Sequence, residues 1–135
     1  MDGQNNLYQD CISVLKQNDV GGWTKPALHL YPHQWFWDSC FIAIGQRHFD
    51  VKRAQKEIKS LLRGQWKNGM IPNMIYGSDA PYSDDIWNSN VSKNAPKNIQ
   101  TSGITQPPML AEAIVKIGEV MNKTDRKEWY KSVYD

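Results

Sequence analysis

The chain has 135 residues, of which 40% are hydrophobic and 22% are charged, and its formal net charge is +2. This size and composition fit one globular domain and exclude a disordered or low-complexity chain. The small net charge, spread along helical patterns, argues against a nucleic-acid partner. No apolar run approaches the ~20 residues of a membrane span, so no membrane partner is expected.

Two cysteines, Cys11 and Cys40, stand alone in apolar helical patterns. Neither has a second cysteine or a histidine at ligand spacing, so we expect two buried thiols rather than a disulfide or a metal site. Residues 1–6 lack the cationic and apolar regions of a secretory signal peptide. A cytoplasmic location is therefore predicted, and nothing in the sequence indicates a metal or an organic cofactor.

Three helices are predicted in the first half of the chain by apolar residues at helical spacing. The stripe of the first helix is Leu7, Cys11, Val14 and Leu15. The stripe of the second, which runs toward residue 48, is Trp37, Phe41 and Ile44. Asp50 is the expected N-cap of the third helix, and Gly64 ends it. Its predicted core face is Val51, Ala54, Ile58 and Leu61, and its predicted solvent face is Lys52, Arg53, Lys56, Lys59 and Arg63.

Two more helices are predicted near the C-terminus. Pro107 and Pro108 open the fourth, at a position where a missing N–H costs nothing. The stripe of this fourth helix is Leu110, Ile114, Ile117 and Met121. Thr124 is the expected cap of the fifth helix, with Trp129 on its inner side. No alternating strand pattern occurs, so the predicted fold class is all-α, with antiparallel helices.

The segment 65–106 has no helical period. Loops of about forty residues are uncommon in a small domain, and they are usually functional or belong to a larger assembly. Gly69, Gly77 and Gly103 are the expected turn points of this loop. Short helices can scarcely cover so large a loop, so we expect this chain to be one end of a larger domain.

Residues 31–40 combine four aromatic side chains with one carboxylate. Aromatic faces and convergent polar groups are what a sugar-binding pocket needs. The candidate binding residues in this segment are Tyr31, Gln34, Trp35, Trp37 and Asp38. From the residues alone, Asp38 fits a helix first-turn acid equally well. The two tryptophans alone fit core packing better than a sugar platform.

Three segments, residues 31–39, 63–72 and 101–108, resemble successive motifs of the mannosylglycerate/glucosylglycerate hydrolase group within glycoside hydrolase family 63. They read YPHQWFWDS, RGQWKNGMIP and TSGITQPP, and their order and spacing agree with that group. The resemblance implies an (α/α)6 barrel of six helical hairpins and hydrolysis of an α-glycosidic bond with inversion. Such barrels are much longer than this chain, so 1–135 is expected to be the N-terminal portion of one catalytic domain, cut at its C-terminus.

The resemblance also implies roles for particular residues. The glycosyl subsite would be lined by Tyr31, Trp35, Trp37 and Asp38. Gln106 would lie at the same pocket, at a helix N-terminus. Tyr82 corresponds by position to a tyrosine on a loop that closes over the substrate, although segment 80–87 departs from the usual glycine-containing version.

Inverting hydrolysis uses one carboxyl group as acid and another as base, roughly 6.5 to 9.5 Å apart. By the resemblance both lie beyond Asp135, so no catalytic residue is expected in this chain. Its predicted partner is a small carbohydrate substrate. The alternative is a noncatalytic helical carbohydrate-binding or scaffold protein that keeps the motifs without the acid and base. Continuation of the gene into further hairpins separates the two.

Overall fold

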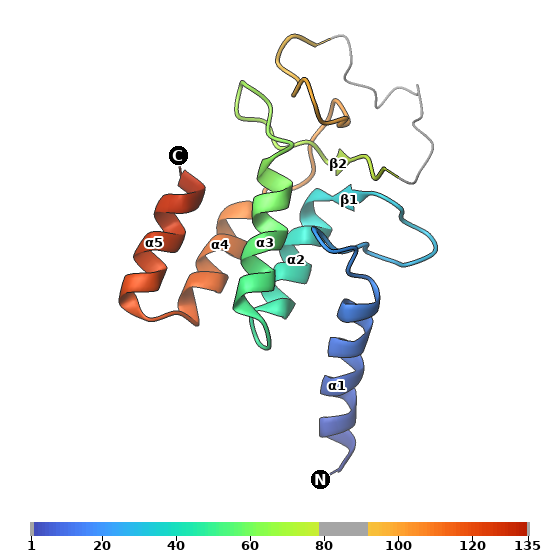
Figure 1. Ribbon diagram of the computed structural model, residues 1–135, viewed down its shortest axis with the longest axis vertical. Coiled ribbons are helices and arrows are strands. Elements are labelled where there is room, and N and C mark those ends of the chain that lie inside the picture. Colours follow the sequence, from blue (N-terminus) through green and yellow to red (C-terminus); the bar gives the residue numbers. More distant parts are fainter. Residues whose placement is uncertain (1, 79–91, 135) are drawn as a thin grey trace.

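Five helices and one short β-ladder make up the part of the computed structural model that is described, residues 2–78 and 92–134, with side chains from residue 6 onward (Figure 1). The elements are α1 (Asp2–Gln17), β1 (Gln34–Trp35), α2 (Phe36–Gln46), α3 (Val51–Leu62), β2 (Met74–Ile75), α4 (Leu110–Glu119) and α5 (Lys123–Tyr134). No helix within these ranges has the length and apolar character needed to cross a membrane. The all-α prediction is confirmed.

The core lies among α2, α3, α4 and α5, which stand side by side, while α1 projects away from them (Figure 1). α2 packs against both α3 and α4, and α4 packs against α5. The buried apolar side chains of these helices are Phe36, Cys40, Ala43, Ala54, Ile58, Leu61, Ala113, Ile117 and Trp129. Removing apolar surface from water at roughly 25 cal/mol per Å² is what holds the four helices together.

The third helix is the one that the sequence predicts best. Asp50 Oδ1 accepts a hydrogen bond from the backbone N–H of Arg53 at 2.9 Å, which is the predicted N-cap. Ala54, Ile58 and Leu61 are fully buried, as their spacing predicts. Local signals suffice here because this helix has one strongly apolar face.

The starts of the last two helices differ from the prediction. The fourth begins at Leu110, two residues after the Pro107–Pro108 pair that is predicted to open it. The fifth is capped by Asn122, whose Oδ1 accepts from the backbone N–H of Asp125 at 2.9 Å. The predicted cap Thr124 is wrong because it lies inside the first turn of α5.

The predicted stripe of α2 is wrong for Trp37 and Phe41, whereas Ile44 packs against the core as predicted. Trp37 and Phe41 are 41% and 51% exposed, and the helix instead buries Phe36, Cys40 and Ala43. The segment from 36 to 44 is apolar on almost every side, so periodicity alone could not choose between the two faces.

The stripe of α1 lies largely outside the core. Leu7 is 66% exposed and Val14 54% exposed, and Cys11 is exposed as well, so the prediction of a buried Cys11 is wrong. The physical reason is that α1 packs mainly against α2, and the contact between the two helices is small. Cys40 is buried as predicted.

A two-residue antiparallel ladder joins β1 to β2, with Gln34 opposite Ile75 and Trp35 opposite Met74. Ile75 also forms an isolated bridge with Thr101. The expectation of no strand is therefore wrong at these few residues. The ladder has a functional consequence, since it brings together the three segments 31–39, 63–78 and 101–108, which are far apart in sequence.

Candidate functional site

A hollow of about 350 Å³ opens at the N-terminal end of α2 and is called the α2 hollow below. Its lining residues are Pro26, Tyr31, Trp35, Trp37, Asp38 and Gln106. The structure thus brings together five of the seven residues predicted for the site. Pro26 is additional, and no sequence motif signalled its position.

Aromatic rings that meet edge to face form one side of the α2 hollow. Tyr31 and Trp35 meet edge to face with ring centroids 6.0 Å apart, and Trp37 meets Phe41 in the same manner at 5.8 Å. Trp35 points toward the hollow because successive side chains of a strand point to opposite faces, and its neighbour Gln34 points inward. Tyr31 and Trp37 keep almost half of their surface exposed.

The backbone at the start of α2 is held by groups from the long loop. The first N–H groups of a helix have no partner inside the helix, and Trp35 at the N-cap offers no side-chain acceptor. Instead, the N–H of Phe36 donates to the carbonyl of Asn73 at 2.9 Å, and the N–H of Trp37 donates to Gln106 Oε1 at 3.1 Å. Gln106 therefore lies at the N-terminus of α2, whereas the prediction placed it at the start of the following helix.

Asp38 lies in the first turn of α2 with its side chain half-buried. Burial raises the pKa of Asp38 above its usual value, and the hydrogen bond from its own backbone N–H opposes that shift. No other described residue donates a hydrogen bond to its carboxylate. A partly desolvated carboxylate without a partner is unfavourable by itself, so this group is available to a ligand that brings donors.

The other two predicted site residues lie elsewhere. Gln34 is 1% exposed, and its amide is used within the protein: Nε2 donates to Ser39 Oγ at 3.0 Å and Oε1 accepts from Ser60 Oγ at 3.0 Å. Its side chain is on the opposite face of β1 from that of Trp35 and does not line the α2 hollow. Tyr82 lies outside the described residues.

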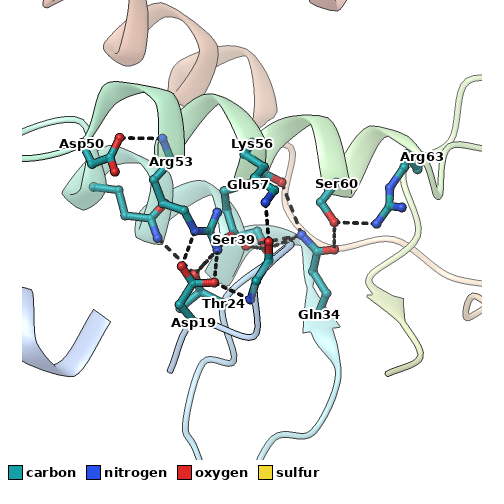
Figure 2. Close-up of polar contacts among 12 residues, drawn as sticks. Asp19, Thr24, Gln34, Ser39, Asp50, Arg53, Lys56, Glu57, Ser60 and Arg63 are labelled. Carbon is teal, nitrogen blue, oxygen red and sulfur yellow. Dashed lines mark hydrogen bonds and ion pairs between the residues drawn. The ribbon is translucent and has the colours of Figure 1, made fainter. Parts of the chain in front are cut away.

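A buried polar cluster that joins α3 to β1, the first turn of α2 and the loop after α1 was not predicted (Figure 2). Its centre is Glu57 of α3, which is fully buried. Glu57 Oε1 accepts from Ser39 Oγ at 2.7 Å and from Gln34 Nε2 at 3.3 Å. Its Oε2 accepts from Thr24 Oγ1 and from Arg53 Nη2, both at 2.9 Å. Burial raises the pKa of Glu57, and the donors from Ser39, Arg53 and Thr24 oppose the shift.

Arg53 links this cluster to the loop after α1. Its Nε donates to Asp19 Oδ2 at 2.6 Å and its Nη2 to Asp19 Oδ1 at 3.1 Å. Burial by itself would raise the pKa of Asp19, but the hydrogen bonds from Arg53 and Gly21 outweigh it, and the pKa is lowered. The prediction that Arg53 belongs to the solvent face is therefore wrong, since only 11% of its side chain is exposed.

Two other side chains, Cys40 and His33, are of types that can carry chemistry. Burial raises the pKa of the Cys40 thiol to about 12, and the charges of Glu57 and Asp38 act in the same direction, so this thiol is a poor nucleophile. His33 Nδ1 accepts from the backbone N–H of Gly77 at 3.1 Å. Across residues 2–78 and 92–134, no group of three or more His, Cys, Asp or Glu side chains is placed to hold a metal ion.

The chain was compared with known proteins. Residues 31–135 match the family model for the mannosylglycerate hydrolase MGH1-like glycoside hydrolase domain. The chain belongs to this family. A mannosylglycerate hydrolase from Rubrobacter radiotolerans is 42% identical over 115 residues, which are 83% of this chain and 26% of the relative. A glucosylglycerate hydrolase from Mycolicibacterium hassiacum is 44% identical over 110 residues, 78% of this chain and 25% of the relative. The MGH1-like chain thus spans about a quarter of the length of these relatives.

Solved structures agree with this membership. The GH63 mannosylglycerate hydrolase from Thermus thermophilus in complex with Tris superposes with a TM-score of 0.75 at 33% identity, covering 95% of this chain and 30% of that one. The same enzyme in complex with glucose gives a TM-score of 0.71 at 35% identity, covering 93% of this chain and 29% of that one. The predicted similarity to family 63 is confirmed. The MGH1-like chain corresponds to part of an (α/α)6-type fold.

Proposed function

We propose that this MGH1-like chain forms the glycosyl-binding part of an enzyme that hydrolyses the α-glycosidic bond of mannosylglycerate or glucosylglycerate. The observation that carries the proposal is the state of Asp38, a half-buried carboxylate that receives no hydrogen bond from any other described residue. It lines the same hollow as the exposed rings of Tyr31 and Trp37 and the side chain of Gln106. Sugar hydroxyls are donors of the kind that such a carboxylate lacks.

The other side chains of the α2 hollow are proposed to contact different parts of the sugar. Trp35 and Trp37 offer ring faces to the C–H surface of a sugar ring. Gln106 uses its Oε1 on the helix backbone, and no described residue accepts from its Nε2, so that N–H₂ group can donate to a sugar oxygen. Support comes from the relatives, one of which was crystallised with glucose and also with Tris and D-glycerate.

The chemical step in this proposal is inverting hydrolysis. It needs two carboxyl groups roughly 6.5 to 9.5 Å apart, with room for water between them. Asp38 is the one carboxyl that lines the α2 hollow among the described residues, and its proposed role is to bind the sugar. The acid and the base are assigned to other parts of the full-length gene product. The reducing cytoplasm is the proposed location, since Cys11 and Cys40 are both unpaired.

The proposal is tested with the full-length gene product and each of the two glycosylglycerates. Proton NMR in the first minutes identifies which anomer of the sugar is released, and inversion at an α-linkage gives the β-anomer first. Early release of the α-anomer would contradict inversion but not the hydrolase activity. Absence of turnover of both compounds would contradict the enzymatic proposal. A calorimetric titration with glucose would then show whether the noncatalytic binding alternative holds.

A further inference from the structure

Three consecutive stretches of chain form most of the α2 hollow. The loop after α1 supplies Pro26 and Tyr31, the strand β1 supplies Trp35, and the first turn of α2 supplies Trp37 and Asp38. The β-ladder and the contacts of the long loop hold β1 and the start of α2. One further group, the carboxylate of Glu57, contacts all three stretches.

One oxygen of Glu57 holds the strand and the first turn of α2 (Figure 2). Gln34 directly precedes Trp35, and Ser39 directly follows Asp38. The Ser39 hydroxyl donates to Glu57 Oε1 at 2.7 Å and accepts from Gln34 Nε2 at 3.0 Å. In sequence, Trp35, Trp37 and Asp38 therefore lie between two residues whose side chains bind the same carboxylate oxygen.

The other oxygen of Glu57 holds the loop (Figure 2). Thr24, two residues before Pro26, donates to Glu57 Oε2 at 2.9 Å. The Thr24 hydroxyl also accepts from Gln46 Nε2 at 3.0 Å and from Arg53 Nη2 at 2.8 Å. Arg53 additionally donates to Glu57 Oε2 at 2.9 Å, which places a positive charge beside the buried carboxylate.

We infer that Glu57 is a positioning residue for the α2 hollow, whose carboxylate fixes the three stretches that carry the sugar-binding side chains. The inference rests on the proposed function, since it assigns the role of Glu57 through those side chains. Glu57 does not line the hollow and does not touch the sugar. It acts from α3, through Ser39, Gln34 and Thr24.

The chemistry of the four donors explains why a carboxylate is needed at this position. An ionised carboxylate accepts at both oxygens, whereas an amide accepts at one and donates at the other. The hydroxyls of Ser39 and Thr24 can turn and accept, but the guanidinium of Arg53 and the N–H₂ of Gln34 can only donate. In Glu57→Gln the single oxygen faces the charged Arg53, so the N–H₂ group of the new amide opposes that of Gln34 and β1 is displaced.

The test measures kcat, KM and thermal melting of the full-length gene product in the wild type and in Glu57→Gln, at a temperature well below all the melting transitions. We expect kcat/KM of Glu57→Gln to fall at least ~10-fold, mainly in kcat, because contacts to the reacting sugar are the ones that strengthen in the transition state. Ser39→Ala, which removes one of the donors and leaves the charge pair intact, is the milder variant and is expected to lose at least ~3-fold.

The matched control is Trp129→Phe, which removes a donor to the carbonyl of Ile114 at 2.9 Å, and neither residue lines the hollow. It should lower the melting temperature and leave kcat/KM unchanged. Normal kcat/KM in both Glu57→Gln and Ser39→Ala, with lowered melting temperatures, would overturn the positioning role alone. Absence of wild-type turnover would overturn the proposed function and this inference together.

Discussion

Replacement of Asp38 by Asn in the full-length gene product should show whether Asp38 binds the sugar or only stabilises the helix. The substitution keeps the size of the side chain and removes the charge that makes hydrogen bonds from sugar hydroxyls strong. If those bonds strengthen as the sugar approaches its oxocarbenium-like transition state, kcat falls at least ~10²-fold, which is about 2.7 kcal/mol of transition-state stabilisation. Binding of the ground state should weaken less.

The stability of Asp38→Asn should change in the opposite sense to that of an ordinary first-turn acid. A first-turn acid stabilises its helix by about 0.3 to 1 kcal/mol through the helix dipole. Burial nevertheless raises the pKa of Asp38, so at neutral pH its ionised form is less favourable in the folded protein than in the unfolded chain. We therefore expect Asp38→Asn to melt at the wild-type temperature or slightly above it.

Steady-state kinetics and a thermal melt of Asp38→Asn distinguish the sugar-binding role of Asp38 from a structural role. Glu112→Gln is the control, because Glu112 is an exposed first-turn acid of α4 outside the α2 hollow. The control should keep wild-type kcat. A nearly normal kcat with a lowered melting temperature in Asp38→Asn would show that Asp38 belongs to the scaffold.

Three further outcomes are expected. Urea unfolding at several pH values should show that Asp38→Asn gains stability relative to the wild type as pH rises from 3.8 through the raised pKa of Asp38, and that the gain is constant at higher pH. A gain that does not change with pH would contradict the raised pKa. Gln106→Ala should lower both the melting temperature and kcat/KM. Gln106→Glu keeps the acceptor for the α2 backbone, so it should have the wild-type melting temperature and a low kcat/KM. A wild-type kcat/KM in Gln106→Glu would show that the Gln106 N–H₂ group does not donate to the sugar. Gly77→Ala should cost about 1 to 3 kcal/mol in urea unfolding because its new methyl group meets the carbonyl oxygen of Pro32, while Gly22→Ala, with open space around it, should not.

The accuracy of the helix predictions depended on how one-sided each helix is. The core face of α3 could be read from sequence because Lys52, Lys56 and Lys59 are exposed and alternate with Ala54, Ile58 and Leu61, although Arg53, whose side chain is only 11% exposed, follows the same charge pattern. In α2 the sequence offers apolar residues on all sides, and only the packing of α3 and α4 selects the buried face. The exposure of Trp37 could therefore not be derived from periodicity, although it is what places this ring in the hollow.

The site was predicted in part for a related reason. Tyr31, Trp35 and Asp38 lie within one short motif, whereas Gln106 is brought to it by the long loop and was found through the family resemblance. Glu57 was missed, although a signal existed. It lies three residues after Ala54 and four before Leu61, so helical spacing places it on the buried face, where a lone carboxylate requires partners.

Glu57 and Asp38 have different roles because they differ in the hydrogen bonds that they already accept within the protein. Glu57 accepts from four donors within the protein, so its acceptor positions are occupied and it has no capacity left for a sugar. Among the described residues, Asp38 accepts from its own backbone N–H alone, so it adds little to the fold and keeps its capacity for a ligand. Loss of charge should consequently have opposite signatures at the two positions. Asp38→Asn should lose activity and keep stability, while Glu57→Gln should lose both, because the donors that it leaves unpaired lie inside the protein.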